Sequence, residues 1–209
     1  MKTPLLLTLI LTCLFNFNFK AQDNTAFEKG TIVATAGYGF PDLYRTNLRV
    51  SYNGYSSRTI RGFGPLILKG DYGIVKFKWG HSVGAGIVIG YSSTKVEYIN
   101  NYYGPIAGVY TETDNYRTIT IGARGTYHFY TKEKIDCYAS IGLGYNINSF
   151  TQTHNNPNGY YARTGNARAG LYSAFTVGIR YYFTKNIGVY AEGGWDMSAP
   201  IQGGVAIKF

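Results

Sequence analysis

Apolar residues recur at every second position along most of the chain after residue 30. The clearest segment is 171–183, in which Val177 and Ile179 lie on one face and Thr176 and Arg180 lie on the other. A period of two is that of a β-strand with two unlike faces. Apolar residues at helical spacing do not occur in any sustained run. The pattern therefore predicts a chain built from strands.

The same alternation predicts seven further strands, which makes about eight in all. Alternation is weakest in the segment 70–78, so the pattern does not set the register there. The other expected strands lie near residues 32–40, 70–78, 83–91, 119–129, 135–147, 187–196 and 201–209.

The connections between these strands alternate between short and long. Short turns are expected at 78–81, 131–134 and 184–186, and long loops at 41–62, 100–114 and 149–169. Short turns at one rim and long loops at the other are typical of an outer-membrane barrel. The sequence thus predicts an all-β fold, a transmembrane antiparallel up-and-down β-barrel of about eight strands.

Aromatic residues on the apolar face indicate what that face contacts. They gather near both ends of the strands, while the middle of the face is aliphatic or small. Two aromatic bands around an aliphatic belt match the two interfaces of a bilayer, so the apolar face is expected outside. The opposite face is rich in small residues and fits a narrow lumen filled by side chains. The predicted bands contain Phe77, Trp79, Tyr127, Phe129, Tyr181 and Phe183 at the short-turn rim, and Tyr38, Phe40, Tyr91, Tyr145 and Trp195 at the long-loop rim.

The first 21 residues have the layout of a secretory signal peptide. Lys2 precedes an apolar stretch from residue 5 to 15, and a short polar and aromatic tract ends at Ala21. This predicts export and the domains 1–21 signal peptide, 22–30 short N-terminal segment and 31–209 outer-membrane β-barrel. Removal of Lys2 and Lys20 lowers the net charge from +9 to +7, and Cys137 is then the one cysteine left.

Composition excludes several other classes. Charged residues make up 15% of the chain, against roughly 25% in an average soluble domain, and Gly 27 and Tyr 21 are unusually many. A mean hydropathy of −0.13 and no apolar run near 20 residues after the N-terminus exclude a bundle of membrane helices. What remains is a glycine- and tyrosine-rich β-domain.

These features together resemble the small outer-membrane β-barrels represented by OmpX and the OmpA transmembrane domain, loosely labelled porin-like. The resemblance covers nearly everything after Phe27 and includes a last strand, IQGGVAIKF, that ends in Phe209. It implies an outer-membrane location, a monomer, and recognition of Phe209 by the barrel-assembly machinery.

Charged residues on the putative lumen face predict an internal ion network. With a tight turn at 184–186, Arg180 is expected diagonal to Glu192, and His128 nearly opposite Asp136. Charges that lack water must be paired. A gated ion or proton path is the alternative, although an eight-stranded barrel is too narrow for a wide pore. The predicted network consists of Arg124, Arg180, Glu192, His128 and Asp136.

Arginines and tyrosines in the long connections are the strongest partner signal. Guanidinium groups there could bind lipopolysaccharide phosphates, or could simply keep the loops solvated. Tyrosine is enriched at binding surfaces, so an unknown extracellular ligand is a further hypothesis. The pI of about 9.4 does not indicate nucleic acid, because the charges are dispersed in an exported chain. The candidate lipopolysaccharide contacts are Arg45, Arg49, Arg58, Arg61, Arg163 and Arg168.

Enzyme, metal and cofactor signals are weak. His81 with Ser82, and His154, have no carboxylate close in sequence to complete a triad. Metal-ligand spacing and a phosphate-binding glycine loop are absent from the sequence, so no cofactor is expected. We expect a structural or surface-interaction protein; a narrow channel, a lipid-modifying barrel enzyme and a soluble periplasmic ligand-binding barrel remain alternatives.

Overall fold

The computed structural model describes residues 25–55, 57–102, 108–155 and 163–209. The predicted signal peptide lies outside the described residues. The elements are β1 (Ile32–Phe40), α2 (Leu43–Ser51), β2 (Arg58–Lys76), β3 (Ser82–Tyr102), β4 (Gly108–Thr131), β5 (Ile135–His154), β6 (Arg163–Tyr182), β7 (Ile187–Asp196) and β8 (Ala199–Lys208).

The eight strands form one closed antiparallel barrel in which each strand pairs with its neighbours in sequence. Closure comes from β1 and β8, which pair from Val33 opposite Lys208 to Phe40 opposite Ile201. Tight connections hold the short-turn rim, as in the hydrogen bond from the amide of Phe77 to the carbonyl of His81. The predicted all-β, up-and-down architecture of about eight strands is confirmed.

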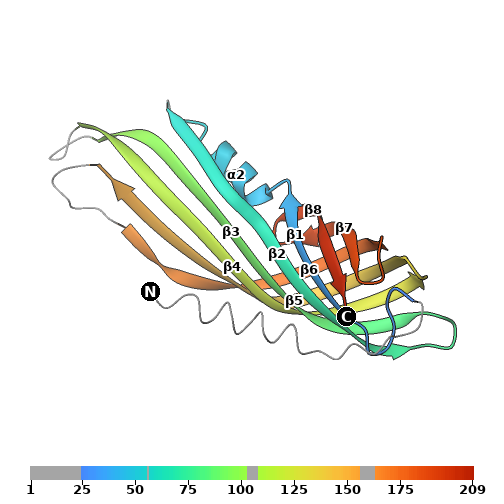
Figure 1. Ribbon diagram of the computed structural model, residues 1–209. Coiled ribbons are helices and arrows are strands. Elements are labelled where there is room, and N and C mark those ends of the chain that lie inside the picture. Colours follow the sequence, from blue (N-terminus) through green and yellow to red (C-terminus); the bar gives the residue numbers. More distant parts are fainter. Residues whose placement is uncertain (1–24, 56, 103–107, 156–162) are drawn as a thin grey trace, which may run out of the picture.

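Strand length divides the barrel wall into a tall side and a short side. β2 to β6 have 19 to 24 residues, whereas β1, β7 and β8 have 9 or 10. A strand needs only about 9–11 residues to cross a bilayer. The long strands therefore continue as a five-stranded sheet beyond the far rim, which Figure 1 shows extending past β1, β7 and β8. We call the part of β2 to β6 beyond this rim the projecting sheet.

The projecting sheet corrects the expected loops. The described residues of the segments 100–114 and 149–169 are almost all strand, since β3 reaches Tyr102, β4 starts at Gly108, β5 reaches His154 and β6 starts at Arg163. β2 also begins at Arg58 rather than near residue 70. The prediction was wrong because it followed apolar alternation, which weakens where polar residues appear on the outward face of the strands, while the hydrogen-bonded ladder continues.

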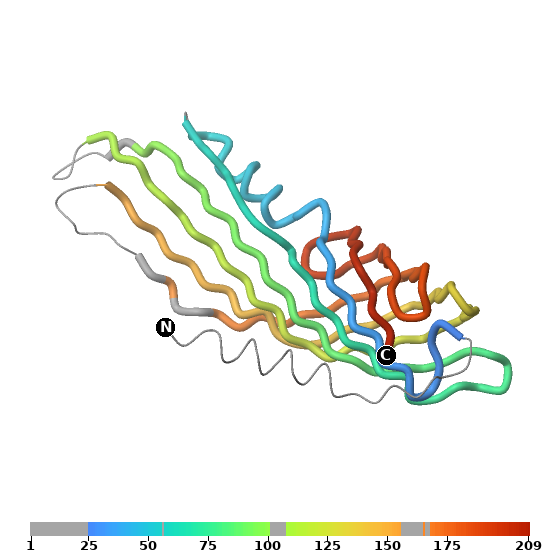
Figure 2. The backbone as a smooth tube through the Cα atoms, viewed as in Figure 1, coloured from blue at the N-terminus to red at the C-terminus, as the bar shows by residue number. Residues whose placement is uncertain are grey.

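The helix α2 was also not expected, because helical apolar spacing is short and incomplete in residues 41–62. Asp42 caps it by accepting a hydrogen bond from the amide of Arg45. Leu48 is its one buried residue and packs against Val96 and Tyr98 of β3. The helix therefore lies against the inner, concave face of the projecting sheet, beside β2 in Figure 2.

Inward and outward positions alternate along most of the wall and change phase at bulges, such as the one between Gly73 and Val75. On β3, Val88 is fully buried while Ile87 is 61% exposed. Residues before β1 fill the short-turn end of the lumen, where Ala26 and Phe27 are fully buried and the amide of Ala26 donates to the carbonyl of Lys132. The core of the molecule is thus the barrel interior, and most of the large apolar residues of the wall face outward.

Candidate functional site

The centre of the lumen holds a cluster of buried charges around Glu192. Its carboxylate accepts from Lys69 Nζ at 2.6 Å and from the hydroxyl of Tyr138 at 2.7 Å, and lies 3.3 Å from Arg124. Lys69 also pairs with Asp196 at 2.9 Å. All five side chains are at least 95% buried, so each charge is compensated by close partners instead of water.

A second charge cluster lies nearer the short-turn rim. Arg180, which is fully buried, donates to Asp71 and, at 3.2 Å, to Asp136. Asp136 also lies 2.7 Å from Nδ1 of His128. Arg124 Nε approaches Asp71 at 3.3 Å and so joins this cluster to the one around Glu192.

All five residues predicted for the ion network lie in it, and His128 contacts Asp136 as expected, but Arg180 and Glu192 pair with other residues rather than with each other. Arg180 binds Asp71 and Asp136, and Glu192 binds Lys69 and Arg124. Arg180 does lie diagonal to Glu192, because it is opposite Tyr190 on β7. Sequence reasoning missed three members because the register of β2 and the bulge before Asp196 were not fixed; they are Lys69, Asp71 and Asp196.

Apolar layers close the network on both sides. Below it, the ring of Phe27 stacks on His128 with centroids 3.7 Å apart, within a cluster with Val33 and Tyr182. Above it, Met197 packs with Ile67, Val88 and Tyr172.

Gly90 makes room for this upper layer. A Cβ atom at Gly90 would lie 2.0 Å from the sulfur of Met197, so any side chain there would displace it. The turn that carries Met197 has φ of 47° at that residue and 60° at Ser198. The charged part of the lumen therefore lies between two apolar layers.

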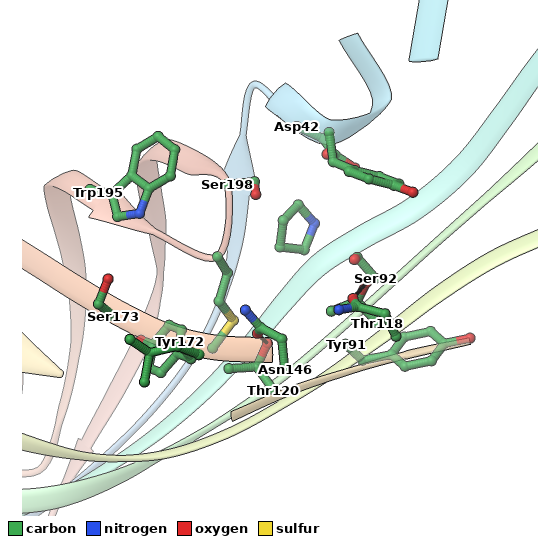
Figure 3. Close-up of a pocket in the computed structure, with 15 residues that line it drawn as sticks. Asp42, Tyr91, Ser92, Thr118, Thr120, Asn146, Tyr172, Ser173, Trp195 and Ser198 are labelled. Atoms are coloured by element: carbon green, nitrogen blue, oxygen red, sulfur yellow. Dashed lines mark hydrogen bonds between the residues drawn. The ribbon is translucent and has the colours of Figure 1, made fainter. Parts of the chain in front are cut away.

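A cavity of about 180 Å³ lies directly above the upper layer, at the mouth of the barrel. Figure 3 shows Ser92, Thr118, Thr120 and Asn146 gathered on one side of it, while the rings of Tyr91 and Trp195 lie at its margins. Residues from α2 and from the β7–β8 turn complete the wall. The lining is mostly uncharged and polar, unlike the lumen below.

Carboxylates and tyrosines hold the end of α2 on the projecting sheet. The Tyr52 hydroxyl donates to Asp114 and lies 2.8 Å from the Tyr116 hydroxyl, and the Tyr98 hydroxyl donates to Glu112 at 2.6 Å. Burial raises the pKa of Asp114 above 3.8, although the hydrogen bonds from Tyr52 and Tyr98 act against this. Burial likewise raises the pKa of Tyr52 and Tyr98, which therefore remain hydrogen-bond donors.

The candidate arginines of the long connections have different surroundings. Arg45 pairs with Asp42 at 3.1 Å and donates to the carbonyl of Gly64, and Arg58 donates to the carbonyl of Arg49 and the side chain of Asn53. Arg45 and Arg58 thus fasten α2 within the molecule. Arg49 and Arg168 are exposed, and the side chain of Arg163 lies outside the described residues.

Arg61 is the candidate that lies on the outer surface of the projecting sheet. It pairs in register with Lys95, and a shallow hollow that these two residues line also includes Arg117 and the aromatic residues Phe63 and Tyr91. Lys95 and Arg117 were not identified from the sequence, because both lie outside the expected strands 83–91 and 119–129 and so were not assigned to either face of the barrel.

The aromatic residues predicted for the two bands all lie on the outer wall. Exposed fractions range from 37% for Tyr91 to 74% for Trp79. Phe209 is half-buried, and its backbone pairs with Ile32. The exposed set includes Tyr38, Phe40, Phe77, Trp79, Tyr91, Tyr127, Phe129, Tyr145, Tyr181, Phe183 and Trp195.

The two histidines considered for catalysis, His81 and His154, lie in different parts of the structure and contact different residues. His81 Nδ1 lies 2.5 Å from the hydroxyl of Tyr127, and its ring stacks near Trp79, whereas the neighbouring Ser82 is fully buried. His154 is opposite Glu112 across β4 and β5. Within the described ranges, no group of three or more histidine, cysteine and acidic residues could hold a metal ion. Nor does the described part of the chain contain a helix long and apolar enough to cross a membrane.

Comparisons with known proteins returned structural similarities only. No family model and no curated protein matches the chain. The structure is similar to that of Ail, the attachment invasion locus protein of Yersinia pestis, solved in complex with the heparin analogue sucrose octasulfate, with 12% identity, a TM-score of 0.43, and coverage of 87% of this chain and 99% of that one. It is also similar to the N-terminal β-barrel domain of Pseudomonas aeruginosa OprF, with 16% identity, a TM-score of 0.36, and coverage of 87% and 98%. The assignment of the fold rests on the strand pairing itself.

Proposed function

We propose that this chain is an integral outer-membrane β-barrel with a sealed lumen, whose projecting sheet and α2 form an extracellular interaction surface. The supporting observation is the inverted barrel: buried charges such as Arg180 and Glu192 lie inside, and exposed aliphatic residues such as Ile87 and Leu143 lie outside. In water, such a continuous apolar belt would drive aggregation, whereas lipid solvates it.

Extraction separates this proposal from a soluble periplasmic barrel. The protein should remain in the membrane fraction through salt and alkaline washes, dissolve only with detergent, and migrate differently on a gel before and after boiling. Release into detergent-free buffer as a folded monomer would contradict the membrane assignment.

The sealed lumen favours a structural or surface role over a narrow channel. An ion that crossed the barrel would have to displace the Met197 layer, break the pairs around Glu192 and Arg180, and pass Phe27. In planar bilayers the protein should therefore give flat current traces over a range of voltages. Reproducible conductance steps would support the channel instead.

Arg61, Lys95 and Arg117 are proposed to bind phosphate groups of lipopolysaccharide. They line one hollow on the outer surface together with Tyr91 of the aromatic band, which supports a position near the lipid headgroups. Glu97 pairs with Lys95 at 2.6 Å and offsets only part of this charge. Bidentate guanidinium contacts suit phosphate.

Lipid retention tests this contact. The double variant Arg61→Gln, Arg117→Gln should lose at least half of the lipopolysaccharide that co-purifies in mild detergent, and the loss should grow with salt. Arg49→Gln, an exposed arginine on α2, is the matched control and should retain it. Equal retention in both variants would remove these residues from lipid binding.

The projecting sheet also has an open edge that suits a protein partner. The described pairing between β6 and β7 extends only to Phe175 opposite Trp195, so β6 continues beyond it without a neighbour on that side. An unpaired strand edge can accept a strand from another chain. Proline at Ser173 would block such pairing, and unchanged cell-surface binding in that variant would count against this edge.

We propose no enzymatic role. The opposed environments of His81 and Ser82 support this, because a nucleophile and its base must lie within hydrogen-bond reach. His81→Ala and His154→Ala should leave any lipid-hydrolysis or acyl-transfer rate at the background level of the native protein. We further propose that the protein is exported, that it is a monomer, and that the barrel-assembly machinery recognises Phe209.

A further inference from the structure

The mouth cavity is built from two threonine–asparagine pairs on facing strands. Thr118 donates to the amide oxygen of Asn148 at 2.8 Å, and Thr120 donates to that of Asn146 at 2.6 Å. Since each amide oxygen is already an acceptor, the amide nitrogens remain to donate, and the threonine oxygens can still accept. The cavity thus offers donors and acceptors in alternation along one wall.

Two aromatic rings that line the cavity are held in place by contacts with neighbouring residues. Tyr172 lies beside the floor and is held by a 2.6 Å hydrogen bond from its hydroxyl to Asp196. Tyr44 of α2 lines the opposite side, in edge contact with Tyr116 at a centroid distance of 5.8 Å. Rings held in this manner provide flat apolar faces beside the polar wall.

Charge is nearly absent from the lining. Asp42 is the one charged residue among the described lining residues, and it pairs with Arg45 and caps α2. The cations of the lumen lie below the layer formed by Met197 and Tyr172. An anionic ligand would therefore find no cation in this cavity to compensate its charge.

A wider hollow of about 520 Å³ continues from the cavity and shares Tyr44, Thr118 and Asn148 with it. Phe150 adds another ring along this hollow, and Arg117 and Arg168 line it as well, so the hollow carries cations that the mouth cavity lacks. Ligand pockets usually occupy about 300–1,000 Å³. The mouth cavity alone is large enough for one ring-sized unit, and the hollow leaves room for a chain to continue beyond it.

We propose that the mouth cavity binds one neutral sugar unit at the end of a short oligosaccharide, the rest of which extends into the hollow. Sugar hydroxyls both donate and accept, as the Thr–Asn wall requires, and the C–H face of a pyranose ring packs on an aromatic ring. The inference rests on the proposed function, because it supplies the ligand class for the extracellular surface. The same chemistry is available from a soluble glycan and from the core sugars of lipopolysaccharide.

Titration with neutral disaccharides tests this site. The full chain, in lauryldimethylamine oxide so that no glycoside detergent competes, is titrated with maltose, cellobiose and lactose by isothermal calorimetry and saturation-transfer NMR. At least one should bind saturably, and Asn146→Leu, which removes the amide at nearly constant volume, should weaken that binding at least about ten-fold. A second arm replaces the disaccharides with purified lipopolysaccharide and so distinguishes the two sources.

Asn115→Leu is the matched control, because Asn115 is on the same sheet and lines the hollow of the outer surface instead. It should bind as the native protein does, and both variants should keep their heat-modifiable migration. The proposal is overturned if folded native protein binds none of the probes up to about 10 mM, if Asn146→Leu binds equally well, or if only anionic saccharides bind. Each of these results would leave the membrane assignment intact, since detergent extraction tests that separately.

Discussion

The two halves of β3 and β4 have opposite polarity on the same uninterrupted ladder. In the lower half, Ile87 and Ile121 are exposed and Arg124 is buried; in the projecting half, Val96 is buried and Lys95 is exposed. The register between the two strands runs from Ser82 opposite His128 to Tyr102 opposite Gly108 without a shift. Backbone pairing between the two strands therefore does not depend on which face of the sheet is apolar.

This difference shows that the surroundings of each half determine which of its faces carries apolar side chains. In the membrane location proposed above, lipid solvates the outer apolar residues and the lumen must compensate its own charges. Beyond it, water solvates both Lys95 and Glu97, and the concave face acquires a small apolar core with Leu48 of α2. The lower half thus has charged residues inside and apolar residues outside, whereas the upper half has apolar residues inside and charged residues outside, as in a soluble protein.

The largest expected effect comes from removing a lumen cation. Arg180→Met should destabilise the barrel by about 3–5 kcal/mol, because Asp71 and Asp136 would remain buried without it. Urea unfolding in lipid vesicles measures the change. Arg117→Met, on the exposed face of the projecting sheet, should change stability by less than about 0.5 kcal/mol. Equal effects would mean that the two halves do not differ as described.

A charge added to the outer wall should have the next largest effect. Ile87→Arg lies in the middle of the apolar belt and should cost about 2–4 kcal/mol of folding free energy in vesicles. Thr113→Arg, at a half-buried position on the projecting part of β4, should cost about 0–1 kcal/mol, as near a membrane interface. A similar cost at both positions would place the two halves in one environment.

The smallest expected effect concerns pH and α2. Because burial raises the pKa of Asp114, its contribution to docking of Tyr52 is fully present below 3.8 and is lost as the pH rises through the raised value. Glu112, Tyr98 and Tyr116 face the same carboxylate or its hydrogen-bond partners. Hydrogen exchange of residues 43–52, corrected for intrinsic rates, should therefore show stronger protection in acid.

Asp114→Asn is the variant that tests this assignment. It should remove most of the pH dependence, and the amide oxygen can still accept from Tyr52. Barrel amides near Ile121 should show no matching change in either protein. A pH response of α2 that persists in the variant would exclude Asp114 as its origin.

The sequence was sufficient to predict the barrel because apolar and small or polar residues alternate strongly wherever the outer face is apolar. It also identified Arg180, Glu192 and Asp136 as inward charges, since parity within a regular strand assigns each residue to a face. Lys69 and Asp71 were not predicted to face the lumen, because glycines at positions 70 and 73 weaken the alternation of apolar and polar residues along β2. Pairing across distant strands, such as Arg180 with Asp71, depends on barrel closure, which sequence periodicity does not determine.

The upper half could not be predicted in the same way. Between Ser92 and Asn100, both faces of β3 carry polar residues, so the strand resembles a loop in its pattern. α2 depends on one capping residue, Asp42, and one buried residue, Leu48, which is too little signal for a helical period. The mouth cavity combines residues from β3, β4, β5 and α2 and exists only once the barrel has closed.

The inverted barrel can be tested most directly with its two tryptophans, Trp79 and Trp195, which lie exposed at opposite ends of the outer belt. Single-tryptophan variants, and Ile121→Trp in a tryptophan-free background, are folded into vesicles of lipids brominated at defined depths. The account predicts that both native tryptophans are quenched most by bromines near the headgroups, and that the residue 121 tryptophan is quenched most by bromines near the chain ends. Fluorescence unaffected by bromine at any depth would show that the belt does not face lipid and would contradict the account.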